Sequence, residues 1–208
     1  MQRHRCANSF QSTYNKPTIY KGDDYVSSTT EKIVLGSGEM FIMEFSGELP
    51  TTEEICVPEN RLGHVSGGAT LEYAPSYYTA VDDLGVISKT IVTQEEATLK
   101  SGILTFSGET LTRLTETGRV SEDGNVRTVK IGGIKNSDRK NYVITFYVHD
   151  AADGDIWVQI VGRNEAGFSL SFAKDKETII DAEFKCQPMD DEGTLITYIE
   201  EIKQSAAG

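Results

Sequence analysis

The sequence predicts a mainly β protein: an antiparallel β-sandwich with one flanking helix and extended arms. From residue 126 onward, apolar and polar residues alternate in short runs separated by Gly- and Asp-containing turns, which is typical of antiparallel strands. The chain has 208 residues, 38% of them hydrophobic, and no Pro/Gly/Ser-rich linker divides it. One domain can therefore hold the core. A single compact helix pattern interrupts the strands.

The first half predicts strands and an arm. "KIVLGSGEMFIMEF" (32–45) reads as two strands hinged at the glycines of Gly-Ser-Gly. The segment 46–60 is acidic, irregular and longer than ~12 residues, a length that is uncommon in loops without a role, so it is a candidate contact arm. Two Tyr-rich extended segments follow, with a turn at Asp82-Asp83-Leu84-Gly85. We therefore expect the arm within about residues 46–92.

The helix pattern runs from about Thr93 to Ser101. Thr93 and Glu96 have the spacing of a capping box, in which each side chain bonds to the backbone N–H of the other residue. Lys100 suits the negative end of the helix dipole, and Gly102 can adopt a left-handed stop conformation. A helix this short does not persist alone, so we expect it to dock on the sandwich.

The second half predicts a meander of hairpins. Alternation predicts strands at 141–150 and 155–161, joined by a tight turn at Asp153-Gly154. In the first of these runs both faces can be covered. Further strands are predicted at 167–174, 178–186 and 193–202, the last at a sheet edge or in an arm. In the 178–186 run a register slip would bury three charges, so its faces are firmly specified.

Charge and targeting signals exclude several classes of protein. The net charge is −12 and the sequence pI is near 4.7, which disfavours ordinary nucleic-acid binding. The first 16 residues are basic but contain no apolar run, so they are not a secretory signal, and no segment has the ~18 apolar residues of a membrane span. We expect a flexible leader at 1–15 and a single domain at 16–208.

The three cysteines, Cys6, Cys56 and Cys186, are widely spaced and odd in number. This pattern favours reduced thiols in a protein that is made in a reducing cytoplasm. Cys186 is in phase with the apolar residues of its strand, so we expect it to pack in the core.

The motifs of enzymes and cofactor sites are incomplete, so we predict no catalytic, metal or cofactor residues and no enzyme. The Gly pairs lack the remainder of a phosphate loop. His64 and Ser66 are not surrounded by a nucleophile signature. His149 and the three Asp residues that follow it fail the calcium-loop spacing, and a solvated turn explains them better.

Tyrosines in extended segments are the more informative candidates, because such residues either contribute to a core or anchor an interface. For Tyr73 the core is the safer expectation, although it remains a candidate contact. The candidate inter-subunit contacts are Tyr20, Tyr25, Tyr73, Tyr77 and Tyr78.

The order of these features resembles the major tail tube protein of tailed bacteriophages, of the siphophage type that infects Gram-positive hosts. The resemblance is carried by "IVLGSGEMFI", then "ENRLGHVSGGATLEYAP", then "DLGVISKTIVTQEEATLKSGILTF" and the C-terminal meander. It covers the chain from roughly Ile33 to the C-terminus and is a pattern of phrases, not a catalytic motif.

The resemblance implies the tail-tube fold, a β-sandwich with one helix and a loop or hairpin that reaches neighbouring subunits. It implies hexameric rings stacked into a tube that conducts DNA without specific binding, located in the virion tail and assembled in the host cytoplasm. Implied partners are further copies of the chain and the tape-measure, tail-terminator and distal-tail proteins. Six copies at −12 would carry −72 per ring, and a lumen sharing that charge would repel DNA.

The lumen and the rival functions stay open at this level. Asp181 and Glu183 are candidate lumen-facing acids because they lie opposite a well-defined apolar face, although the same alternation fits an outer wall facing solvent. The inner tube of a contractile tail, or of a phage-tail-like bacteriocin, fits equally well. A soluble β-sandwich binding module is the alternative from another class, and a hydrolase ranks last.

Overall fold

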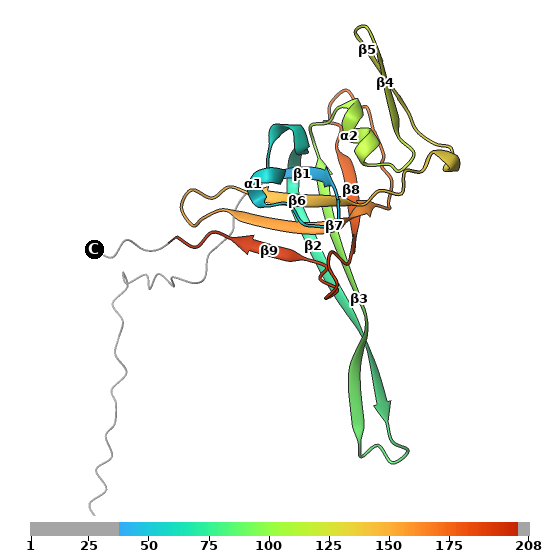
Figure 1. The fold of residues 1–208 in the computed structure, drawn as a ribbon, viewed down its shortest axis with the longest axis vertical. Coiled ribbons are helices and arrows are strands. Elements are labelled where there is room, and N and C mark those ends of the chain that lie inside the picture. Colours follow the sequence, from blue (N-terminus) through green and yellow to red (C-terminus); the bar gives the residue numbers. More distant parts are fainter. Residues whose placement is uncertain (1–37, 204–208) are drawn as a thin grey trace, which may run out of the picture. The chain divides into compact units, whose positions relative to one another are not determined.

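The computed structural model describes residues 38–203, which all belong to one compact unit. Leader residues 1–15, the predicted strand before Gly38 and the candidates Tyr20 and Tyr25 lie outside the described residues. Figure 1 labels the elements. The strands are β1 (Glu39–Glu44), β2 (Arg61–Val81), β3 (Ser88–Ile103), β4 (Arg119–Asp123), β5 (Val126–Lys130), β6 (Tyr142–Val148), β7 (Ile156–Asn164), β8 (Ile180–Gln187) and β9 (Thr197–Glu200). The helices are α1 (Thr52–Ile55), η1 (Pro58–Asn60), α2 (Gly108–Arg113) and η2 (Ile134–Asn136).

The main sheet closes on itself. Its strand order is β6-β1-β2-β3-β8-β7-β9, and an additional pairing joins β6 to β7. Every pairing in this circuit is antiparallel. The mainly β, antiparallel architecture predicted from the sequence is thus confirmed, and the arrangement is consistent with a sandwich whose edges are joined. Because the sheet is closed, few strand edges remain free to pair with the strands of another chain.

The core lies inside the circuit, because alternate residues of each strand point inward. Strand β8 illustrates the rule: Ile180, Ala182, Phe184 and Cys186 are buried while the residues between them are exposed. The predicted faces of this strand and the core position of Cys186 are therefore confirmed. Helix α2 contributes to the same core, since Leu111 packs against it.

A second, smaller core lies on the outer face of β1, β6 and β7. Val143 and Val161 point away from the main core and pack together with Phe41, Ile55 and Met189. The prediction that both faces of the strand at 141–150 are covered is thus confirmed. The turn at Asp153-Gly154 joins β6 and β7 as predicted.

The segment 46–60 covers this second core and is not an extended arm. Thr51 begins α1 with a capping box: the Glu54 backbone N–H bonds to the Thr51 hydroxyl at 3.3 Å, and the Thr51 backbone N–H bonds to the Glu54 carboxylate at 2.8 Å. This cap points Ile55 inward, where it is 0% exposed. The acidic composition misled the prediction, because the acids face solvent while Ile55, with Leu49 and Cys56 beside it, packs on the second core.

The helix predicted at Thr93–Ser101 is wrong, because these residues belong to β3. Ala97, Leu99, Ser101 and Ile103 alternate toward the core. All four pair with β2, and the last three also pair with β8 on the other side. Pairing with β2 along the segment, and also with β8 from Thr98 onward, satisfies its backbone groups, and this outweighs a local capping pattern worth about 1 kcal/mol. Helix α2, which Ser107 caps, lies beside the main core instead.

The strand predicted at 167–174 is also wrong. These residues form a loop between β7 and β8, which pair directly with each other and leave the loop no partner strand. Phe168 and Leu170 still pack against the main core, but Phe172 is 81% exposed. The predicted C-terminal edge strand is confirmed as β9, which among the described strands pairs only with β7.

Candidate assembly surfaces

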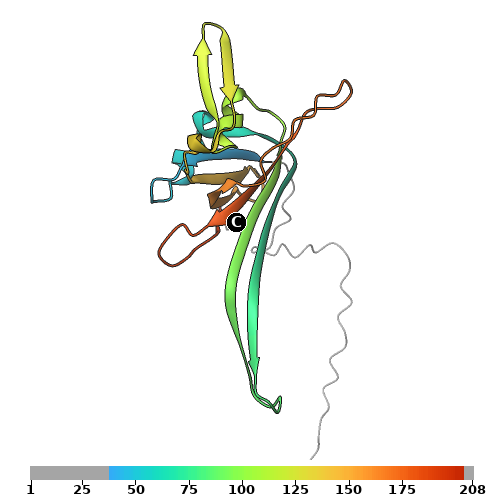
Figure 2. The same ribbon diagram turned by 90° about the vertical axis from the view of Figure 1, so that its right-hand side faces the viewer.

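The β2–β3 hairpin extends beyond the closed circuit as a two-stranded ribbon (Figures 1 and 2). Pairing between β3 and β8 ends at Thr98, so from there toward the turn β2 and β3 pair only with each other. We call residues 73–97 the arm. At ~3.3 Å per residue, each of its strands spans about 30 Å, and the turn at the tip adds a little more. The predicted Tyr-rich hairpin is therefore present, and its length far exceeds what the core needs.

The tip of the arm is the turn predicted at Asp82–Gly85. The Asp82 carbonyl accepts from the Gly85 N–H at 2.9 Å, and the Asp82 carboxylate accepts from the Ile87 N–H at 2.7 Å. These backbone hydrogen bonds, chiefly that from Ile87, lower the pKa of Asp82. Gly85 has a φ of 70°, a conformation that favours glycine. The tip is thus a defined turn that holds a carboxylate in its ionised form.

Thr93, the residue predicted to cap a helix, forms a β-bulge in the arm. Ser76 pairs with Gln94 and Tyr77 pairs with Val92, so Thr93 is an extra residue on β3. Its hydroxyl donates to the Ser76 carbonyl at 3.3 Å. A bulge of this kind increases the local twist of a ribbon.

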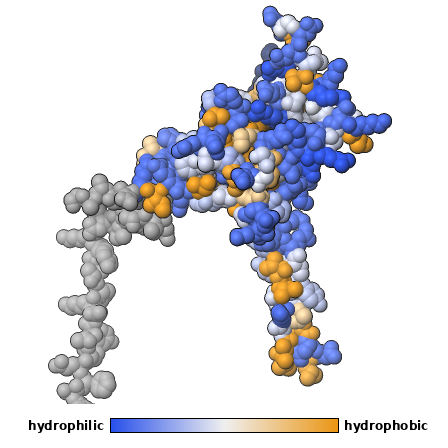
Figure 3. Space-filling view, viewed as in Figure 1, coloured by the Kyte–Doolittle hydropathy of each residue, from blue (hydrophilic) through white to orange (hydrophobic). Residues whose placement is uncertain are grey.

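Both faces of the arm carry exposed apolar side chains. Tyr77 pairs with Val92 on one face and Tyr78 pairs with Ile91 on the other, because successive residues point to opposite sides. Tyr77 is 63% exposed, and Tyr78 is also exposed. The tip adds the exposed residues Leu84, Val86 and Ile87. Figure 3 shows this apolar surface along the arm and at its end.

Tyr73, for which the core was the safer expectation, is exposed at the base of the arm. Its hydroxyl donates to the Glu95 carboxylate, and this hydrogen bond raises the pKa of Tyr73. The core prediction for Tyr73 is wrong because it pairs with Ala97 at the point where the sheet narrows to two strands. The structure brings Tyr73, Tyr77 and Tyr78 together on one ribbon.

Sequence reasoning missed the aliphatic residues of the tip. Leu84 lies in the turn, and Val86 and Ile87 follow directly after it, at positions where polar residues are usual. Apolar residues at a turn far from any core were the sequence signal that could have identified this exposed surface. They make the arm an exposed apolar feature of the kind that marks interaction sites.

Asp181 and Glu183 lie on the exposed face of β8, as their alternation predicted. They border an open hollow of about 440 Å³ that also includes Gly67, Gly68 and Lys100. Lys100 lies opposite Glu183 in register, and its ammonium bonds to the Glu72 carboxylate at 2.8 Å. That hydrogen bond, and then the nearby Glu183, raise the pKa of Lys100. The face carries cations as well as acids, and whether it lines a lumen stays a prediction.

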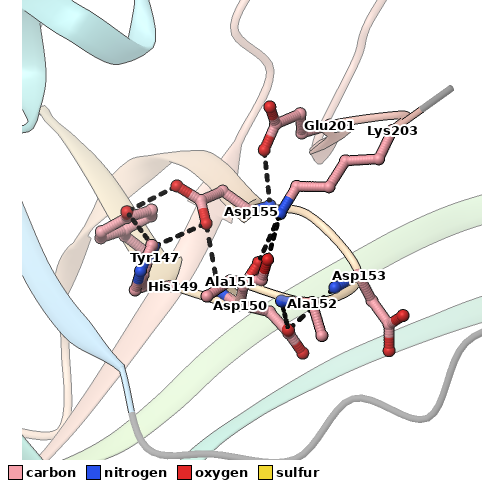
Figure 4. Close-up of polar contacts among 9 residues, drawn as sticks. All are labelled: Tyr147, His149, Asp150, Ala151, Ala152, Asp153, Asp155, Glu201 and Lys203. Atoms are coloured by element: carbon pink, nitrogen blue, oxygen red, sulfur yellow. Dashed lines mark hydrogen bonds and ion pairs between the residues drawn. The ribbon is translucent and has the colours of Figure 1, made fainter. Parts of the chain in front are cut away.

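The acidic turn after β6 is held by a set of hydrogen bonds centred on Asp155, which we call the clasp (Figure 4). Asp155 accepts from the Tyr147 hydroxyl at 2.7 Å and from the Asp150 backbone N–H at 3.0 Å, and His149 Nδ1 lies 2.8 Å from the same carboxylate. Glu201 accepts from the Asp155 N–H at 3.2 Å, which ties the turn to the chain after β9. Within the described part of the chain, no group of three or more His, Cys, Asp or Glu side chains could hold a metal ion.

Hydrogen bonding sets the ionisation of the clasp. Burial raises the pKa of Asp155, but the hydrogen bonds from Tyr147, Asp150 and His149 outweigh it and lower the pKa below its ordinary value. Burial and the bond to Asp155 raise the pKa of Tyr147 to about 12. Tyr147 also stacks on Trp157, with ring centroids 5.5 Å apart. The hydrogen bonds of this carboxylate therefore hold the turn together.

The β4–β5 hairpin is a second exposed ribbon, joined to the main sheet through α2 and the loop after η2. It forms a separate two-stranded sheet, and Glu122 pairs with Arg127 at 2.6 Å across it. Residues 119–140 contain six basic and three acidic residues, a formal charge of +3 in a chain of −12. Ile134 in η2 is 93% exposed. This basic region was not predicted from the sequence.

A comparison with family models and with curated proteins finds no match to this chain. Among residues 38–203, no helix is long and apolar enough to cross a membrane.

Proposed function

We propose that this protein is a structural virion protein, the major tail tube protein of a tailed bacteriophage. In this role it polymerises as stacked hexameric rings into a conduit for DNA ejection. The single observation that carries the proposal is the arm: about 30 Å of ribbon with exposed tyrosines and aliphatic residues on both faces and no partner in its own described chain. A monomeric protein rarely maintains such a surface without a partner to cover it.

The closed body supports the same role. A subunit in a ring or stack benefits from a rigid core that does not open when neighbours bind, and the joined sheet supplies one. The remaining features that could recruit neighbours are the arm, the β4–β5 ribbon and the outer edge of β9. Identical chains that contact one another through different surfaces form rings or open stacks.

Charge supports a passage for DNA and not a binding site. At −12 per chain, rings of six would repel the phosphate backbone, so DNA would slide past them. In this role the partners are other copies of the chain together with tape-measure, tail-terminator and distal-tail proteins. The protein would assemble in the host bacterial cytoplasm and reside in the tail of the virion.

The rival functions differ in the contacts and in the positions of exposed aromatic residues that they require. An inner tube of a contractile tail or of a bacteriocin would use the same contacts and differ by a surrounding sheath protein. A soluble binding module for carbohydrate would place exposed aromatics at one end of the sandwich. Here Trp157 is half-buried beneath Tyr147, and the exposed tyrosines line the arm instead.

Negative-stain electron microscopy of the purified protein over a range of concentrations tests the proposal. Hollow filaments or rings are expected at high concentration. A single monomeric species at every concentration, measured by sedimentation velocity, contradicts the proposal and favours the binding module.

A further inference from the structure

The two ribbons differ in charge and lie beyond opposite ends of the paired segment of β3 and β8. The arm precedes the first paired residues of β3 and β8, whereas α2 and the β4–β5 ribbon follow Ile103. Figures 1 and 2 show the ribbons pointing in opposite directions within this unit. One end of the body thus carries the arm and the other end carries the basic region 119–140.

The two ends of the body carry opposite formal charges. The arm contains four acidic residues and one basic residue, a formal charge of −3, against +3 for the region 119–140. At the arm tip, Asp83 forms no hydrogen bond or ion pair with any described residue, and the neighbouring Leu84 is 85% exposed. In and beside η2, Lys130, Lys135 and Arg139 likewise have no acidic partner within residues 38–203, and Ile134 projects beside them.

The dimensions fit a contact between successive copies. The body without the arm has about 140 residues, which corresponds to a compact unit roughly 35–40 Å across. With its turn, the arm is therefore nearly as long as one body is wide. An arm of this length can reach the facing end of a neighbouring copy and continue past its outermost hairpin to the segment behind it.

We infer that the arm tip of one copy, residues 82–87, docks on residues 130–139 of a second copy. Apolar residues at the tip pack against Ile131 and Ile134, and Asp83 faces Lys135 and its basic neighbours. The contact uses two different surfaces, so it does not close on itself and it propagates as a stack. This inference rests on the proposed function, because it names the surface that receives the arm during stacking.

Charge reversal tests the contact. Asp83→Lys and Lys135→Glu should each raise the critical concentration for polymerisation by about tenfold, since each places like charges together. The double variant restores an opposite pair with reversed polarity and should return to within about threefold of the wild type. Matched controls, Glu177→Lys and Lys174→Glu, make the same charge changes on the exposed loop between β7 and β8 and should have no such effect.

The outcomes separate this inference from the proposed function. All the altered residues are exposed, so thermal unfolding monitored by circular dichroism should be unchanged in each variant. If the wild type polymerises and Lys135→Glu behaves like Lys174→Glu, or if the double variant is not rescued, the docking surface is wrong while the tube proposal stands. If the wild type remains monomeric at every concentration, both proposals fail.

Discussion

Replacing Ile55 by Ala tests whether segment 46–60 is structural cover or an assembly arm. Ile55 is 0% exposed and packs with Phe41, Val143, Val161 and Met189. The substitution removes three carbons, worth about 2.4 kcal/mol of transfer free energy at ~0.8 kcal/mol each. The cavity left between β1, β6 and β7 adds about 1–2 kcal/mol, because rigid strands collapse only in part. We expect a loss of about 3–4 kcal/mol in the free energy of unfolding.

Urea denaturation monitored by tryptophan fluorescence measures this loss. Trp157 is the only tryptophan in the chain and stacks on Tyr147 close to the second core, so its emission reports on the affected region. Glu53→Ala, on the exposed side of α1, is the matched control and should cost well under 1 kcal/mol. At temperatures where Ile55→Ala remains folded, it should still assemble. A stability loss below ~1 kcal/mol together with lost assembly would refute the cover assignment.

Three further predictions address the arm, the clasp and the exposed face of β8. Replacing residues 77–93 by Asn-Gly should leave a folded monomer that does not polymerise, because this part of the arm contributes nothing to the core; filaments of normal appearance from this variant would contradict the arm assignment. The fold lowers the pKa of Asp155, so the ionised carboxylate stabilises the protein above the unfolded pKa of ~3.9, and this stabilisation is lost as the pH falls through the folded value. The wild type should therefore lose more stability than Asp155→Asn between about pH 5 and pH 2. Equal losses in acid denaturation curves would contradict this. Asp181→Lys with Glu183→Lys changes each subunit by +4 and should leave the unfolding free energy within ~0.5 kcal/mol, while DNA ejection from particles slows at low salt; wild-type ejection would place both residues outside the lumen.

The same short pattern, Thr-x-Glu-Glu, occurs twice in this chain with different outcomes. At Thr51 it caps α1, and at Thr93 it lies in a bulged strand. The difference comes from the residues after the second copy, where Ala97, Leu99 and Ile103 recur at even spacing, which fits the two-residue period of a strand and not a helix. A period-2 count over the whole segment would have identified β3, but a reading of cap residues alone could not.

Alternation predicted the strands whose partners lie on both sides. β6, β7 and β8 follow their sequence patterns because each has one set of residues that only the core can accept. The run at 167–174 has the same pattern and forms no strand, because the β7–β8 pairing leaves it without a neighbour. Strand formation there depends on topology, which is not encoded in the run itself.

The candidate arm was predicted in part. Its turn and tyrosines follow from local sequence, since Asp and Gly determine the turn. Its boundaries do not, because they depend on where β8 stops pairing with β3, a contact between residues more than 80 positions apart in the chain. Nor does the sequence reveal that region 119–140 and the arm tip lie toward opposite ends of β3, because their positions depend on the path of the chain through the whole sheet.

The closed circuit also has a consequence for the order of folding. The arm is a local hairpin, and such hairpins form in about 1–10 μs. The body closes only when β1 pairs with β6, across roughly a hundred residues, and such distant contacts form much more slowly. We therefore expect contacts within the arm to begin to form before the core of a newly made chain is complete. Concentrated refolding would let arms meet unfinished bodies, whereas slow synthesis on the ribosome or dilution gives each body time to close first.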